Sequence, residues 1–237
     1  MKLSVVLPTF NERDNVLALL ERLERALDDT AYEVLVVDDD SPDGTAAAVE
    51  GYAAAHPAVR AVRRVGVRGL TSAIQEGIDR SRGAAVAWMD CDLSMPPELV
   101  PTLLAATAEA DVAVGSRYVP GAVDARDDVP LHRLASGVLN GFLRLLLGAA
   151  ITDYTSGFVC ARRAVVERIR LAGDYGEYCI DFLHRSRMLG YRVVEVPYRN
   201  TPRHAGESKT AAGLAGLVRR GTKYLATALR LRRTMGR

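Results

Sequence analysis

The sequence predicts an α/β protein built on a largely parallel β-sheet. Short apolar runs typical of buried strands alternate with segments whose apolar residues recur at helical spacing, a pattern that indicates a parallel sheet with both faces covered. Three of these runs end in polar or acidic residues, and open α/β sheets bind their ligands beyond the carboxyl ends of the strands. The 237 residues, 49% of them hydrophobic and 25% charged, suit one folded domain.

The first half of the chain alternates strands and helices in a regular order. Residues 3–7 form an apolar run that Pro8 closes, and apolar residues from Val16 to Leu23 then recur at helical spacing. A Ser-Pro-Asp-Gly turn follows the second strand, and Pro97 suits the first turn of a helix. We therefore expect strands at residues 3–7, 32–37, 59–65, 84–89 and 111–115, and helices at residues 12–27, 45–55, 70–82 and 96–108.

The second half is less regular. A long, strongly apolar helix is expected at residues 131–150, and its apolar content exceeds one helix face, so contact with lipid and burial in the core are both open. The remaining elements are a strand at 155–161, helices at 162–170 and 178–189, and a last strand at 191–196. No linker, repeat or low-complexity segment interrupts the chain, so we expect one domain, residues 1–210, followed by a helical tail, residues 211–237.

Composition excludes several classes of protein. Three scattered cysteines do not make a disulfide framework and indicate a reducing compartment, and no Cys/His cluster has zinc spacing. The most apolar stretches, residues 134–143 and 145–152, are split by Arg144 and fall short of the roughly 18 apolar residues of a spanning helix. The first residues do not read as a signal peptide. We expect a cytosolic or membrane-surface globular protein.

The net charge of +2 is unevenly distributed along the chain. Residues 203–237 carry nine Lys/Arg and one acidic residue, hence +8, and the preceding 202 residues carry a net −6. A basic tail on an acidic body suggests contact with phosphates. On a helical wheel the tail is amphipathic, which fits either an anionic bilayer surface or docking on its own domain. Its apolar face would hold Leu214, Leu217, Val218, Leu225, Ala228 and Leu229, and its basic face Arg219, Arg220, Lys223, Arg230 and Arg233.

Asp90 and Asp92 stand one residue apart at the end of an expected strand. Two such carboxylates in a loop can converge on one hard divalent cation, which would neutralise charge on a departing nucleotide. The alternative is an acidic cluster that caps the following helix, and the spacing alone favours neither.

Other polar residues at this edge also allow two interpretations. Asp38, Asp39 and Asp40 suit contacts to a ligand at this edge, and the alternative is a set of turn carboxylates around Ser41. Arg117 follows a strand-end Gly-Ser, which favours a place in the cleft over the open surface. Asp153 would either line the cleft or hold a backbone turn.

Six motifs in order resemble the family 2 glycosyltransferases. They are VVLPTFNE, VVDDDSPDGT, WMDCDLSMPPE, GSRYVPG, DYTSGF and RHAGESK, and they extend over nearly the whole chain. The last three are similar to the polyprenyl-phosphate sugar transferases, the branch of the dolichol-phosphate mannose synthases. The chain departs from the family pattern at Thr71, where a glycine is usual, at Tyr154 and Val159 around the DYTSGF motif, and at Asp181, where glutamate is usual.

The resemblance implies a single nucleotide-binding domain of the GT-A fold and assigns candidate site residues. Asp90 and Asp92 would form the metal motif, with Ser94 near the third ligand position and Mg²⁺ or Mn²⁺ as the cofactor. Asp38, Asp39 and Asp40 would hold the base and ribose, of either guanine or uracil. Asp153, if it lines the cleft, would face the acceptor or the sugar. Asp92, Arg117, Arg203 and Lys209 are the candidates for catalysis. The nucleotide-sugar site would comprise Pro8, Phe10, Glu12, Asp38, Asp39, Asp40, Asp90, Cys91, Asp92, Arg117, Arg133, Arg203 and Lys209.

The expected reaction is inverting transfer of mannose from GDP-mannose to a polyprenyl or dolichyl phosphate. A phosphate nucleophile is mostly ionised at neutral pH and needs no strong base, which fits a chain without an obvious base–nucleophile pair. We expect a peripheral protein on the cytoplasmic face of the membrane, with no nucleic-acid partner and with room for a membrane-anchoring partner chain. The alternatives are transfer from UDP-glucose or another UDP-sugar, and a nucleotide-sugar binding protein without turnover. A phosphoacceptor signalling domain is disfavoured, because it would share its acidic cluster with the first strand.

Overall fold

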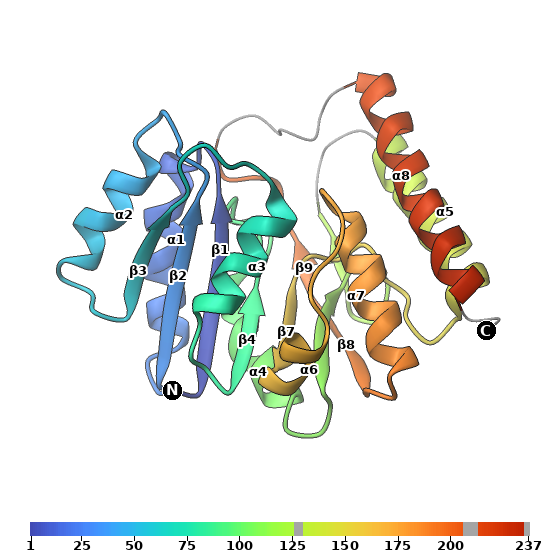
Figure 1. Cartoon of the computed structure of the whole chain (residues 1–237), viewed down its shortest axis with the longest axis horizontal. Coiled ribbons are helices and arrows are strands. Elements are labelled where there is room, and N and C mark those ends of the chain that lie inside the picture. The colour runs from blue at the N-terminus through green and yellow to red at the C-terminus, as the bar shows by residue number, and fades with distance from the viewer. Residues whose placement is uncertain (126–129, 206–212, 235–237) are drawn as a thin grey trace.

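The computed structural model places seven strands in one sheet, in the order β3-β2-β1-β4-β7-β5-β8 (Figure 1). It describes residues 1–125, 130–205 and 213–234, without the side chains of residues 130–134, 213–220 and 234. All pairings in this sheet are parallel except those of β7, which runs antiparallel to both β4 and β5. The strands are β1 (Leu3–Thr9), β2 (Tyr32–Asp38), β3 (Val59–Arg63), β4 (Ala85–Trp88), β5 (Val112–Ser116), β7 (Val159–Arg162) and β8 (Val193–Pro197).

Helices cover both faces of the sheet, because successive side chains of each buried strand point to opposite sides. Leu3, Val5 and Leu7 of β1 pack in one core with α1, α2 and α4, whereas Val6 packs in the other core with α3, α5, α6, α7 and α8. The helices are α1 (Arg13–Ala26), α2 (Thr45–Ala53), α3 (Leu70–Arg80), α4 (Val100–Ala106), α5 (Pro130–Leu147), α6 (Arg163–Arg168), α7 (Glu177–Met188) and α8 (Gly213–Thr234).

Three elements differ from the prediction. The strand expected at residues 155–161 begins only at Val159, because residues 153–155 form a polar loop around Arg117. A 3₁₀ turn, Pro97–Leu99, precedes α4, where one continuous helix was expected. Two short strands, β6 (Val123–Asp124) and β9 (Arg199–Asn200), pair in parallel as a second sheet and were not predicted, since two residues carry no periodic pattern.

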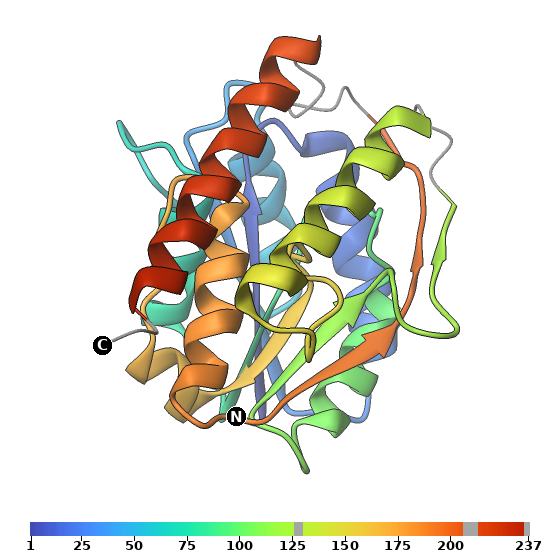
Figure 2. The same ribbon diagram turned by 90° about the vertical axis from the view of Figure 1, so that its right-hand side faces the viewer.

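The C-terminal helix α8 lies against α5 and α7 (Figure 2). Ala228 and Leu231 are buried in this contact, whereas Leu225 and Leu229 keep 37% and 47% of their surface exposed. The predicted apolar face grouped Leu225, Ala228 and Leu229, so it was wrong in part: the docked face is rotated towards Leu231. The predicted contributions of Leu214, Leu217, Val218, Arg219 and Arg220 lie outside the described side chains.

Helix α5 is also two-sided. Leu143 and Leu147 are buried in the core, whereas Val138, Phe142 and Leu145 keep 64%, 38% and 77% of their surface exposed. Core burial therefore holds for one side of this helix, and lipid contact of the exposed side stays a prediction. In the part of the chain that the structure describes, no helix is both long enough and apolar enough to cross a bilayer.

Candidate active site at the carboxyl edge of the sheet

A cavity of about 440 Å³ opens where β1, β2 and β4 end. Parallel strands bring their carboxyl ends to one edge, so motifs distant in the sequence meet there, as the sequence analysis expected. The segment around Arg203, beyond β8, also reaches this cavity. The predicted site residues among its lining are Pro8, Phe10, Glu12, Asp39, Asp90, Cys91, Asp92 and Arg203.

The carboxylates of Asp90 and Asp92 share a crowded corner of the cavity. Burial, together with the nearby carboxylates of Asp92 and Glu12, raises the pKa of Asp90 to about 7. Asp92 accepts hydrogen bonds through Oδ1 from the Ser94 amide at 3.0 Å and the Ser94 hydroxyl at 2.6 Å. Leu93 between them has φ +64°, a left-handed conformation that forms this tight turn.

Arg203 provides the positive charge in this corner. Its guanidinium donates to Asp92 Oδ2 at 3.1 Å and to both carboxylate oxygens of Glu12, so it bridges the ends of β1 and β4. Backbone contacts hold its segment in place: the His204 amide donates to the Asp92 carbonyl at 3.0 Å, and the Thr201 amide to the Ser94 carbonyl at 3.0 Å. The structure therefore brings together three predicted residues from widely separated motifs.

The donor set suits a hard divalent cation. Asp90 and Asp92 offer carboxylate oxygens, and a bound cation would offset the burial and the neighbouring carboxylates that raise the pKa of Asp90. Within the described ranges, no three His, Cys, Asp or Glu side chains form a ready-made metal cluster. Ser94, the predicted third ligand, lies outside the cavity lining and donates its hydroxyl to Asp92.

Phe10 and Asp39 mark a second part of the cavity. The Arg68 guanidinium carbon lies 3.7 Å from the centre of the Phe10 ring, so the two planar groups present a stacking surface. Asp39 accepts hydrogen bonds from Arg64 Nε at 2.7 Å and from the Gly69 amide at 2.8 Å. Its carboxylate thus ties the end of β2 to the loop that precedes α3.

The other two aspartates of the acidic triplet make turn contacts. Asp38 accepts hydrogen bonds from the Ser41 amide at 2.8 Å and the Thr9 hydroxyl at 2.9 Å, and it does not line the cavity. Asp40, also outside the lining, pairs with Arg63 through Nε at 2.7 Å. These contacts match the turn interpretation, and the nucleotide role of Asp38 and Asp40 stays a prediction.

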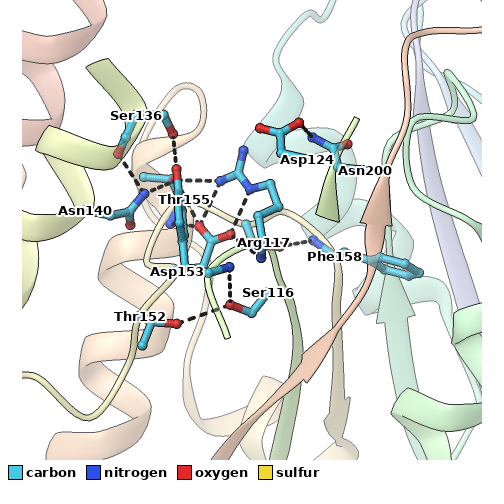
Figure 3. A network of polar contacts seen from close by, with 12 residues as sticks. Ser116, Arg117, Asp124, Ser136, Asn140, Thr152, Asp153, Thr155, Phe158 and Asn200 are labelled. Carbon is cyan, nitrogen blue, oxygen red and sulfur yellow. Dashed lines mark hydrogen bonds and ion pairs between the residues drawn. The ribbon is translucent and has the colours of Figure 1, made fainter. Parts of the chain in front are cut away.

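Arg117 and Asp153 form a buried ion pair next to the cavity (Figure 3). Arg117 donates through Nε and Nη2 to the two oxygens of Asp153, both at 2.8 Å, and through Nη2 to Thr155 at 2.8 Å. Burial alone would lower the pKa of Arg117, but the Asp153 carboxylate outweighs it and the pKa is raised. Together the two residues join β5 to the loop before β7, and the catalytic role of Arg117 stays a prediction. Arg133 and Lys209 lie outside the described side chains.

The sequence analysis missed one side of the cavity. Asp174, Tyr175, Gly176, Tyr178 and Cys179, from the loop before α7 and the first turn of α7, line it together with Tyr224 of α8. The glycines and aromatic residues of this loop were the available signal. Nothing in the pattern of a basic amphipathic tail indicated that Tyr224 reaches the site. Arg68, three residues before Thr71, also lines the cavity and was not among the predicted site residues.

A carboxylate-lined cavity at the carboxyl edge of a mostly parallel sheet is typical of an α/β protein that binds a ligand there. Residues 4–170 match the model of glycosyl transferase family 2, and the chain belongs to this family. The predicted family and enzyme class are therefore confirmed.

Several curated relatives match most of the chain. It is 37% identical to a dolichol-phosphate mannosyltransferase of Pyrococcus furiosus, over 88% of this chain and 59% of the relative. It is 41% identical to a polyprenol monophosphomannose synthase of Mycolicibacterium smegmatis, over 86% of this chain and 79% of the relative. It is 35% identical to an undecaprenyl-phosphate mannosyltransferase of Micrococcus luteus, over 91% of this chain and 90% of the relative. The chain thus spans about three fifths of the archaeal relative and most of the two bacterial ones.

Solved structures of one enzyme share the fold. Glucosyl-3-phosphoglycerate synthase from Mycobacterium tuberculosis, in complex with Mn²⁺, UDP-glucose and phosphoglyceric acid, superposes with a TM-score of 0.74 at 20% identity, over 98% of this chain and 79% of that one. The same enzyme with Mg²⁺ and UDP gives a TM-score of 0.71 at 22% identity, over 97% and 79%. This likeness confirms the predicted GT-A fold.

Proposed function

We propose that this chain transfers mannose from GDP-mannose to the phosphate of a polyprenyl lipid. The observation that carries the proposal is the agreement among the three relatives, which are 35–41% identical to this chain. Their names differ in the lipid, which is dolichol, polyprenol or undecaprenol, and agree on mannose and on a polyprenyl phosphate acceptor.

The reaction is a single displacement. An oxygen of the lipid phosphate attacks the anomeric carbon, the bond from that carbon to the diphosphate breaks, and GDP leaves with the electron pair, so the configuration inverts. The second pKa of a phosphomonoester is about 6, so the nucleophile is already ionised at neutral pH. In keeping with this, the described lining of the cavity contains no histidine that would serve as a base.

Two carboxylates would hold the metal ion. Asp90 and Asp92 are the proposed ligands of Mg²⁺ or Mn²⁺, and the bound ion would neutralise charge on the leaving diphosphate. The family neighbour crystallised with Mn²⁺ and UDP-glucose supports a divalent ion in this fold. Arg203 would then turn from Asp92 to a phosphate group, for which its planar guanidinium is suited. Lys209 and Arg133 would add positive charge for the acceptor phosphate.

The base would stack on the planar surface that Phe10 and Arg68 form together. Asp39 lies beside this surface, but its carboxylate already accepts hydrogen bonds from Arg64 and Gly69. Fewer of its acceptor positions are therefore open to a nucleotide, because these bonds hold the loop before α3. This arrangement accepts a purine or a pyrimidine ring. A UDP-sugar is the second candidate donor, favoured by the UDP-glucose complex of the structural neighbour.

The exposed apolar sides of α5 and α8 would face the bilayer. Phe142, Leu145, Leu225 and Leu229 are exposed there, and the basic residues of the tail would meet anionic lipid headgroups at the cytoplasmic face. A membrane-anchoring partner chain would bind this same surface of the protein.

A donor and acceptor panel tests the proposal. Purified protein is incubated with GDP-mannose, UDP-glucose or GDP-glucose and with a polyprenyl phosphate in detergent, and the glycosylated lipid is measured with Mg²⁺, Mn²⁺ or excess EDTA. We expect product from GDP-mannose with metal, none in EDTA, and none from Asp92→Ala. Product from UDP-glucose alone would select the second donor, and nucleotide binding without any transfer would indicate a binding protein.

A further inference from the structure

We propose that Tyr224 makes the C-terminal helix α8 part of the active site, by fixing the position of the cavity wall formed by residues 174–176. Tyr224 is thus a positioning residue for the acceptor side of the reaction. The choice of acceptor turnover as the readout rests on the proposed function.

The Tyr224 hydroxyl lies in the space that a side chain at Gly176 would fill. A Cβ atom at Gly176 would lie 2.3 Å from the Tyr224 hydroxyl oxygen, closer than such contacts allow, and a tight 3.2 Å from ring carbon Cζ. Gly176 itself has φ −63° and ψ −14°, a conformation open to every residue. The backbone therefore does not require glycine here, and the close approach of Tyr224 does.

The wall is held from two sides. Lys223, the neighbour of Tyr224 on α8, forms an ion pair with Asp174 at 2.7 Å. On the other side, the Thr71 hydroxyl at the start of α3 donates to the Tyr175 carbonyl at 3.3 Å. The segment between these contacts lines the cavity and leads directly into α7 at Glu177. A shift of α8 would therefore move the wall relative to α3.

The position of Tyr224 points to the acceptor rather than the nucleotide. Phe10, Asp39 and Arg68, which suit the nucleotide, belong to β1, to β2 and to the loop before α3. Tyr224 instead comes from α8, and the next residue, Leu225, belongs to the exposed apolar side of that helix. A lipid phosphate held near this side would enter the cavity past the Tyr224 wall.

Gly176→Ala is the sharpest test, because it adds one methyl group where the Tyr224 hydroxyl lies. The backbone conformation of residue 176 is one that alanine adopts without strain. We expect at least a tenfold loss in kcat/KM for polyprenyl phosphate, with the Kd of GDP and Mn²⁺ within threefold of wild type and the Tm nearly unchanged. Gly221→Ala is the matched control, since a Cβ at Gly221, on the same helix as Tyr224, meets nothing within 4 Å. It should behave as wild type.

A double variant separates positioning from general damage. Tyr224→Phe removes the oxygen that the new methyl would strike, so Gly176→Ala combined with Tyr224→Phe should recover most of the lost turnover. Tyr224→Ala should lower acceptor turnover as Gly176→Ala does and should speed amide hydrogen exchange in residues 174–179.

Several results would overturn the inference. These are unchanged acceptor turnover in Gly176→Ala, an equal loss of GDP affinity, no recovery in the double variant, and unchanged hydrogen exchange in Tyr224→Ala. If wild type transfers no sugar to any polyprenyl phosphate, the proposed function fails instead, and the hydrogen-exchange comparison then decides whether Tyr224 fixes the wall.

Discussion

Arg203 places a cation between carboxylates that would otherwise repel one another. It bridges Glu12 and Asp92, and the Asp90 carboxylate beside them has a raised pKa. A divalent ion bound by Asp92 would compete with this arginine for the same oxygen atoms. The residue therefore affects metal binding as well as the chemistry.

The first prediction separates these two effects. Arg203→Ala should lower acceptor turnover at least about tenfold, since a charge-assisted hydrogen bond contributes roughly 1.5–3 kcal/mol. Mn²⁺ should bind the nucleotide-free variant at least as tightly as wild type, because a competing cation is gone. Both are measurable by turnover assays and titration calorimetry. Arg22→Ala, which removes an exposed pair with Glu98, is the control. Weaker Mn²⁺ binding by Arg203→Ala would contradict the competition.

The second prediction concerns the buried pair of Arg117 and Asp153. Asp153→Asn should lower the free energy of unfolding by about 3–5 kcal/mol, because it leaves the Arg117 charge buried without its partner. Urea unfolding measures this loss. Asp79→Asn, which affects an exposed pair with Arg170, should cost less than about 1 kcal/mol. Similar losses in both variants would show that the Arg117 pair carries no special stability.

Among the helices, α8 has a buried side and an exposed side, and a charged substitution should have a different effect on each. Leu231→Asp should lower the Tm, because it places a charge in the buried contact with the domain. Leu229→Asp should leave the Tm near wild type and weaken sedimentation with anionic vesicles, because Leu229 is exposed. Unaltered vesicle binding by Leu229→Asp would remove this side of the helix from the membrane surface.

Helix α7 carries a pH-sensitive residue in its buried side. Burial lowers the pKa of His184. Asp181 raises this pKa and Arg187 lowers it, each by less than burial does. The folded protein therefore binds a proton at His184 less readily than the unfolded chain does. As a result, the contribution of neutral His184 to the free energy of unfolding falls as the pH drops below about 6.5. His184→Leu should flatten the fall of Tm between neutral and acidic pH. Parallel Tm curves for the two proteins would contradict this assignment.

The sequence predicted the elements better than their contacts. Buried strands such as β1 and β2 were located to within two residues, because apolar runs ended by Pro8 or by aspartates mark them clearly. The carboxyl-edge site followed from topology alone. In contrast, the burial of Leu231 and the place of Tyr224 depend on where α5 and α7 lie, which no local pattern encodes. The pairing of Arg117 with Asp153 likewise arises only when β5 meets the loop before β7.

For the whole molecule, charge is segregated between an acidic body and a basic C-terminal segment. Residues 203–237 carry +8 and the rest −6, so an anionic membrane attracts one end and repels the other. Each basic residue near such a surface contributes roughly 1 kcal/mol of attraction. Binding to anionic vesicles should therefore weaken steeply with ionic strength and with deletion of residues 214–237. Sedimentation of the deleted protein equal to that of the full chain would refute this role.

The position of β7 in the sheet has a consequence for biosynthesis. β7 lies between β4 and β5, yet it follows both in the chain, so a ribosome releases two strands before their common neighbour exists. Until residue 162 emerges, β4 presents an open edge and β5 has no partner strand, since β8 is made later still. Open edges of this kind pair readily with other chains. The segment from β4 to β7 therefore exposes unpaired strand edges until residue 162 has been made, and the sheet is completed only after β8, Val193–Pro197.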